Sequence, residues 1–180
     1  MTSETHTAFD GHRRLASGPL SAVAVAVKRA IEGGEARPIL IFEDATGRAI
    51  DIDTRGAEDE VAARYEPPTR GRGRPKLGVV AREVTLLPRH WDWLNRQSGG
   101  ASVALRKLVE EARRGGDGGR EARDAAYHFM SAVAGNLPGF EEATRALFAG
   151  DRQRFESLIA AWPADVRAHA FMLAFADKAP

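Results

Sequence analysis

Four basic side chains alternate with glycine and proline in the stretch RGRGRPK, residues 70–76. The glycines and the proline exclude a regular helix or strand in isolation, so the stretch is predicted to be a basic ribbon. A run of cations of this density is what a polyphosphate partner requires. The four cations are Arg70, Arg72, Arg74 and Lys76.

The positive charge of the chain is concentrated around this ribbon. Residues 67–114 hold 11 Lys and Arg against 4 Asp and Glu, a net charge of +7. Residues 1–66 have a net charge of −4 and residues 115–180 one of −2, so the chain of 180 residues has a net charge of +1. A nearly neutral protein therefore contains a strongly basic middle, and this pattern predicts a nucleic acid as its partner.

The ribbon resembles the AT-hook family, whose core is Arg-Gly-Arg-Pro flanked by further basic residues. That core stands here as Arg72-Gly73-Arg74-Pro75. The resemblance implies that glycine, which lacks a Cβ, lets the backbone lie on the floor of a narrow minor groove, while proline keeps the chain extended. The two arginines would then contact A·T pairs, and Arg70 and Lys76 would contact phosphates. The alternative is a solvated basic linker.

The residues after the ribbon predict one strand and two helices. Arg82 to Leu87 is expected to be the strand, Pro88 to Gln97 the first helix and Ser102 to Arg114 the second helix. The two glycines at 99 and 100 predict a tight turn, with Ser102 as the N-cap of the second helix. This pattern resembles the ribbon–helix–helix family of DNA-binding proteins.

The resemblance implies a homodimer, because one strand leaves its pairing edge open and the unit encloses too little core alone. In that family two chains pair their strands into a ribbon that enters the major groove, while amides at the start of the second helices hold phosphate. Val84 and Leu86 are expected to pack inward. Thr85 then faces the nucleic acid and can read bases, whereas Glu83 beside it would lie near phosphates. The alternative is a helix pair that binds protein.

The N-terminal residues predict a small unit of two hairpins and a helix. Residues 7–17 contain an Asp-Gly turn, and residues 39–53 surround the turn residues EDATG. Residues 20–32 alternate in part like a strand, but their apolar positions fall on one helical face and favour a helix. Residues 54–65 predict a short acidic helix.

The C-terminal residues predict a helical bundle. A glycine-rich linker at 115–119 precedes them, and their apolar residues recur at helical spacing. Asp151 is expected to cap the third helix. The four predicted helices are residues 121–135, 140–149, 152–161 and 164–176.

The predicted fold class is therefore α+β in three parts. Residues 1–66 form a small hairpin-and-helix unit, and residues 67–114 form the basic arm with the ribbon–helix–helix-like segment. After the linker at 115–119, residues 120–180 form the bundle.

The sequence contains no motif typical of an enzyme: no phosphate-binding glycine loop, no paired histidines at metal spacing and no nucleophile elbow. His90 is expected at the surface and His128 in a core. We therefore predict no catalytic residue, no cofactor and no metal. The alternative is a metal-dependent enzyme built on an acidic hairpin face, which a solvated surface explains better. That face comprises Glu43, Asp44, Asp51 and Asp53.

Targeting signals are not visible in this sequence. No apolar run reaches the roughly 20 residues that span a bilayer, and the N-terminus does not resemble a secretory signal. The chain has 0 Cys, which excludes disulfides and thiolate metal sites. These features predict a cytoplasmic protein.

Four phrases spread along the chain resemble an uncharacterised bacterial family that is described only as a domain of unknown function. The phrases are TAFDGHRRLASGP, LIFEDATGRAIDID, REVTLLPRHWDWL and LPGFEEATRALFAGDRQRF. The resemblance extends over nearly the full length and implies no biochemical activity. The functional expectation therefore rests on the central segment: a DNA-binding homodimer that acts in transcriptional regulation or as a nucleoid-associated factor.

Overall fold

The computed structural model describes residues 5–34, 38–67, 80, 82–112 and 118–175. The chain divides into two compact units. Unit 1 combines Met1–Pro67 with Gly119–Pro180, and unit 2, Pro68–Gly118, is inserted between these two segments in the sequence. The N-terminal and C-terminal parts, which the sequence analysis treats separately, thus belong to one unit.

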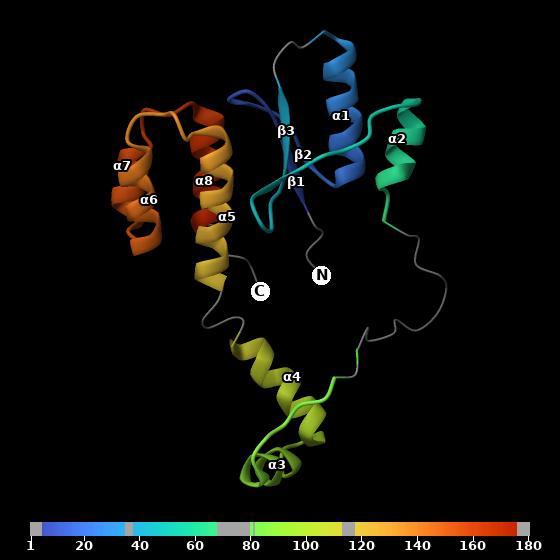
Figure 1. Cartoon of the computed structure of the whole chain (residues 1–180), viewed down its shortest axis with the longest axis vertical. Helices are drawn as coiled ribbons and strands as arrows, with labels where there is room; N and C mark the ends of the chain where they lie inside the picture. Colours follow the sequence, from blue (N-terminus) through green and yellow to red (C-terminus); the bar gives the residue numbers. More distant parts are fainter. Residues whose placement is uncertain (1–4, 35–37, 68–79, 81, 113–117, 176–180) are drawn as a thin grey trace. The chain divides into compact units, whose positions relative to one another are not determined.

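A four-stranded antiparallel sheet with the order β2-β1-β3-β4 lies at the centre of unit 1 (Figure 1). Both predicted hairpins are present, and pairing of β1 with β3 joins them into one sheet. The second hairpin was predicted to extend to residue 53, but its last strand ends at Ile50. The strands are β1 (His6–Asp10), β2 (Arg13–Gly18), β3 (Ile39–Glu43) and β4 (Arg48–Ile50).

Alternate strand residues face opposite sides of the sheet, so each face has its own core. Ala8 and Ile41 pack against Val23 and Val27 of α1 (Leu20–Glu32). The helix predicted over residues 20–32 is confirmed, although Pro19 is its N-cap rather than its first residue. On the other side, the β1 and β3 phenylalanines pack against the C-terminal helices.

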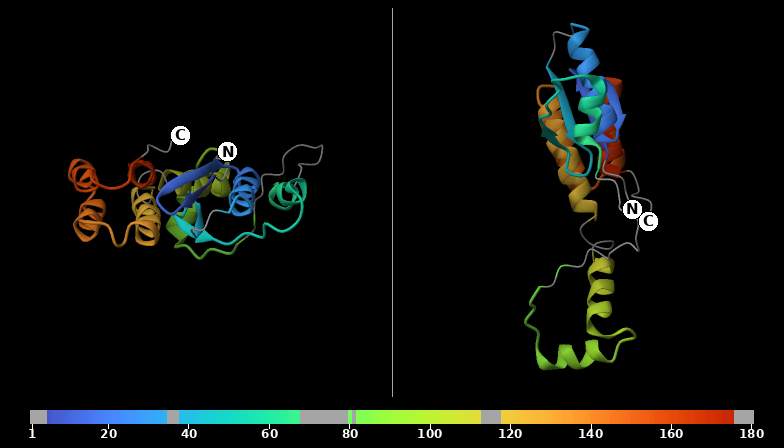
Figure 2. Two further views of the ribbon diagram at one scale, coloured as in Figure 1. Left: turned by 90° about the horizontal axis from the view of Figure 1, so that it is seen from above. Right: turned by 90° about the vertical axis from the view of Figure 1, so that its right-hand side faces the viewer.

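All four predicted C-terminal helices are present: α5 (Gly118–Val133), α6 (Phe140–Ala149), α7 (Arg152–Leu158) and α8 (Ala164–Phe175). Figure 2 shows α5 and α8 against one face of the sheet and α1 against the other. Phe9 and Phe42 of the sheet join one core with Phe129 of α5 and Val166 of α8. The C-terminal helices therefore cover the sheet and share its core.

Two predicted helix signals at the surface of unit 1 are confirmed. Asp151 caps α7, since its carboxylate accepts a hydrogen bond from the Arg154 amide at 3.0 Å. The acidic helix is α2 (Glu58–Tyr65), which packs on α1. Arg29 donates hydrogen bonds of 2.8 and 2.6 Å to Glu58, but this pair is exposed, so burial of Val61 contributes more to the attachment.

Unit 2 contains two helices, α3 (Pro88–Asn95) and α4 (Gly100–Ala112). Pro88 occupies the first turn of α3, as predicted, because a residue there needs no intrahelical N–H donor. Among the helices of the described residues, none is long and apolar enough to cross a membrane.

Candidate nucleic-acid interface

Helices α3 and α4 pack against each other but enclose very little core. In the described part of unit 2, Leu94 and Ala104 are the only buried residues, with exposed fractions of 3% and 6%. A fully buried leucine contributes roughly 2 kcal/mol, which is far below the entropy cost of ordering some 30 residues. The described part of unit 2 therefore lacks the buried surface that a domain needs to be stable alone.

A groove runs between α3, α4 and the segment that precedes α3. Its volume is about 240 Å³. Five of its six lining residues are apolar, so the groove offers an apolar partner a matching surface. The lining residues are Leu86, His90, Trp93, Leu94, Leu105 and Leu108.

Large apolar side chains in the described part of unit 2 remain exposed, and Trp93 and Leu108 of this set line the groove. Trp93 is 51% exposed and Val109 is 56% exposed. Exposed apolar side chains gathered in one patch are typical of interaction surfaces. In the described part of unit 2 the large exposed apolar residues are Val80, Val84, Leu87, Trp93, Leu108 and Val109.

The predicted strand, Arg82 to Leu87, is not helical, and no strand among the described residues pairs with it. Leu86 lines the groove, in agreement with its predicted inward position, whereas Val84 remains half exposed. Thr85 and Glu83 are both exposed. The segment thus keeps free backbone groups that a strand from a second chain could pair with.

The prediction that Ser102 is the N-cap of the second helix is wrong. Helix α4 begins at Gly100, and Ser102 is an exposed residue of its first turn. Gly99 and Gly100 both have positive φ, 90° and 74°, so the backbone reverses at these two glycines and the helix follows at once. The Ser102 hydroxyl nevertheless remains at the N-terminal end of α4, where a phosphate would be favoured.

The AT-hook-like ribbon lies outside the described residues, so Arg70, Arg72, Gly73, Arg74, Pro75 and Lys76 are considered from the sequence alone. In the described part of unit 2, five Lys and Arg stand against four Asp and Glu, a net charge of +1. Most of the positive charge of the central segment therefore comes from the ribbon and from residues 113–114.

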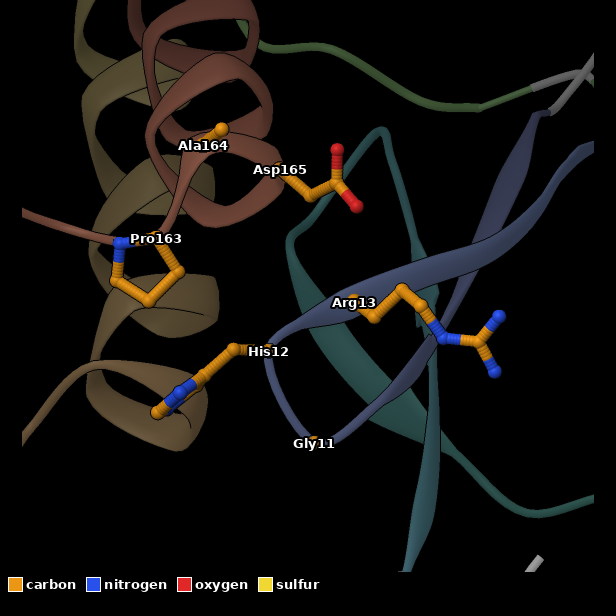
Figure 3. Close-up of a pocket in the computed structure, with 6 residues that line it drawn as sticks. All are labelled: Gly11, His12, Arg13, Pro163, Ala164 and Asp165. Atoms are coloured by element: carbon orange, nitrogen blue, oxygen red, sulfur yellow. The ribbon is translucent and has the colours of Figure 1, made fainter.

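A second hollow, of about 530 Å³, lies in unit 1 between the β1–β2 turn and the start of α8 (Figure 3). Its polar side chains do not converge. His12 points toward α5, with Nε2 3.1 Å from the Val133 carbonyl oxygen, and the Arg13 guanidinium points away from Asp165 to bind Asp10 at 3.1 Å. Asp165 accepts a hydrogen bond from a backbone amide at 2.9 Å. Nothing in this arrangement favours a ligand.

The acidic residues considered as a metal site are engaged separately. Asp53 accepts hydrogen bonds from the Arg55 guanidinium, which hold the pKa of that carboxyl far below its ordinary value. Glu43 accepts a hydrogen bond from Thr46 at 2.6 Å, and Asp44 lies beside His169. Within the described ranges, no three His, Asp or Glu side chains form a group that could hold a metal ion.

His6 and His169 are the buried histidines among the described residues of unit 1, whereas the predicted core residue His128 is only half buried. The His169 ring packs against both Phe9 and Phe129, with centroid distances of 5.4 and 4.6 Å, and its Nε2 is 3.5 Å from Asp44 Oδ1. Burial lowers the pKa of His169 below 6.5, although Asp44 opposes this effect. No sequence signal distinguishes His169, because its helix is apolar on most sides.

A model of the family described as an uncharacterized protein conserved in bacteria, DUF2239, matches residues 5–174. The chain belongs to this family. The match spans both units, so the family contains the inserted segment as well as the sheet and its helices. No curated protein and no solved structure matches the chain.

Proposed function

We propose that this protein binds DNA as a homodimer. Unit 2 supplies the dimer interface, and the ribbon at 70–76 contacts the minor groove of A·T-rich duplexes. The observation that supports this proposal most is the open apolar face of unit 2, next to an unpaired segment and a strongly basic arm.

A second copy of the chain is the partner that fits this face. The six apolar side chains are 42–72% exposed and would supply apolar area to an interface, which in standard complexes buries roughly 800 Å² of each partner. Pairing Arg82–Leu87 with its symmetry mate would satisfy the open backbone groups of both copies. Val84 and Trp93 would become buried in the same step.

The dimer then offers DNA two sets of contacts. Thr85 would face base edges from the paired ribbon, while the amides and Ser102 hydroxyl at the start of α4 would hold phosphate. The arms would add affinity, with Arg72 and Arg74 in the minor groove and flanking cations on phosphates. Gene regulation or chromosome organisation follows from this binding mode.

The nearly balanced charge of the described part of unit 2 favours a second candidate, a non-catalytic interaction module. In that case the dimer forms through the same apolar face, and a protein takes the place of DNA. The two candidates differ in one respect: the module has no duplex affinity even at low salt.

The test is a titration of the full-length protein against A·T-rich and G·C-rich duplexes at 50 and 200 mM salt. We expect tighter binding to the A·T-rich duplex and a loss of about 10³-fold or more between the two salt concentrations, because several phosphates are neutralised. If the protein is a dimer but binds neither duplex at 50 mM salt, the DNA-binding proposal is wrong and the interaction module is favoured.

The contribution of the arm is tested with the double variant Arg72→Ala/Arg74→Ala. It should lose the A·T preference while it keeps the fold and the dimer, because both residues precede in the sequence the residues that form the apolar face. The matched control, Arg48→Ala/Arg120→Ala, removes two exposed arginines from unit 1 and should keep the preference. If both double variants show the same A·T preference, the arm is not the source of that preference.

A further inference from the structure

His90 is the one titratable residue among the six that line the groove of unit 2. It lies on α3 and is exposed in the single chain, so its imidazole is solvated on one side. The other lining residues come from three elements and are all apolar: Leu86 before α3, Trp93 and Leu94 on α3, and Leu105 and Leu108 on α4.

We propose that protonation of His90 opposes closure of the dimer, so that association through unit 2 weakens at acidic pH. This inference rests on the homodimer of the proposed function and names how that same interface is regulated. A partner that covers the groove removes water from the ring. The charged imidazolium then loses its hydration, while the neutral ring does not.

No neighbouring charge in the groove can compensate for the imidazolium. Neither α4 nor residues 82–87 contribute a charged side chain to the lining, and on α3 itself Arg89 and Asp92 flank the histidine outside the groove. A symmetric second copy brings the same apolar residues to the interface. The closed dimer therefore favours neutral His90 in both copies.

The size of the effect follows from the hydration that an imidazolium loses in each copy when the groove closes. We expect the dissociation constant to be about 10-fold or more higher at pH 5.5 than at pH 7.5.

The experiment is analytical ultracentrifugation of the full-length protein over a dilution series at pH 7.5 and pH 5.5. The variants His90→Leu and His90→Gln should dimerise with nearly the same dissociation constant at both pH values. They keep the other four histidines, so any response of unit 1 to acid is present in every sample. The glutamine variant retains a polar side chain in case leucine alters the packing of the groove.

The possible outcomes separate the two proposals. A wild-type dimer whose affinity does not change with pH, or a pH response that persists in both variants, overturns the role of His90 and leaves the dimer in place. A monomer at both pH values, at all concentrations tested, overturns the dimer and with it the proposed function.

Discussion

Gly47 illustrates how a single residue determines the fit between the sheet and its helices. It has a φ of +64° in the β3–β4 turn, a conformation that costs other residues about 1–2 kcal/mol. A Cβ at this position would lie 1.8 Å from the backbone oxygen of Ala125 in α5. The turn therefore reaches the helix backbone directly, and glycine is required for both reasons.

We predict that Gly47→Ala destabilises unit 1 by roughly 2–4 kcal/mol, from backbone strain together with overpacking against α5. Gly34→Ala is the matched control, because Gly34 also has a positive φ, +81°, but no atom lies within 4 Å of its would-be Cβ. It should lose about 1 kcal/mol. Urea unfolding of both variants measures the difference, and equal losses would show that the contact with α5 does not matter.

At the scale of elements, histidines attach the turns of the sheet to the C-terminal helices. His12 in the β1–β2 turn lies 3.1 Å from the Val133 carbonyl oxygen at the end of α5. His128 on α5 lies 3.0 Å from the Thr46 carbonyl oxygen in the β3–β4 turn. His169 on α8 faces Asp44 at the end of β3. Three of the five histidines thus connect the two halves of unit 1.

We predict that unit 1 loses stability as the pH falls through about 6.5. Burial lowers the pKa of His169 in the folded state, so the unfolded chain binds the proton more readily. The stabilising contribution of neutral His169 is therefore fully present above the ordinary histidine pKa and decreases as the pH falls below it. One such group accounts for up to about 1.4 kcal/mol per pH unit. Urea unfolding at pH 7.5 and 5.5 measures this loss.

His169→Gln provides the comparison, since glutamine does not titrate. The variant should be less stable at neutral pH but should show a smaller loss between pH 7.5 and 5.5 than the wild type. If the two proteins lose the same free energy of unfolding on acidification, His169 is not the responsible group.

The elements themselves could largely be predicted from the sequence, because their signals are local. Helix α6 occupies the predicted residues 140–149, between the glycines at 139 and 150, and Asp151 caps the next helix as expected. Helix α4 begins two residues before its predicted start. Serine is a preferred N-cap and therefore favours a start at Ser102, whereas the helix follows directly on Gly99 and Gly100, whose positive φ values cannot be predicted from the sequence.

The packing partners of those elements could not be predicted. Helical spacing shows that Phe129 faces a core, but not that this core contains Phe9 and Phe42 of the sheet. The same limit applies to the candidate site. The basic ribbon is visible as a sequence motif, whereas the groove around His90 requires three elements that only the fold brings together.

At the scale of the whole molecule, unit 2 is an insertion in a domain whose core does not depend on it. Both hydrophobic clusters of unit 1 consist of residues from its own two segments. Within the described residues, unit 2 contributes no side chain to either cluster. The two units can therefore be separated by design.

We predict that a variant with residues 68–118 replaced by a flexible Gly-Ser linker still folds. Its helical and sheet content should correspond to unit 1, and its melting temperature should lie within roughly 5 °C of the value for unit 1 in the full chain, since a small change in loop length costs less than about 1 kcal/mol. The same variant should be monomeric and should not bind DNA. A chain that fails to unfold cooperatively in circular dichroism would contradict this separation.

The insertion also sets the order of events while the protein is being made. Phe9 leaves the ribosome early, but Phe129, whose ring centroid ends up 5.1 Å away, is translated 120 residues later. At a translation rate of about 5–20 residues per second, Phe9 is synthesised roughly 6–24 s before Phe129, so this face of the nascent sheet stays uncovered by α5 for that time. During that interval the whole of unit 2 emerges first, so chaperones have their longest access to the sheet before the last helices arrive.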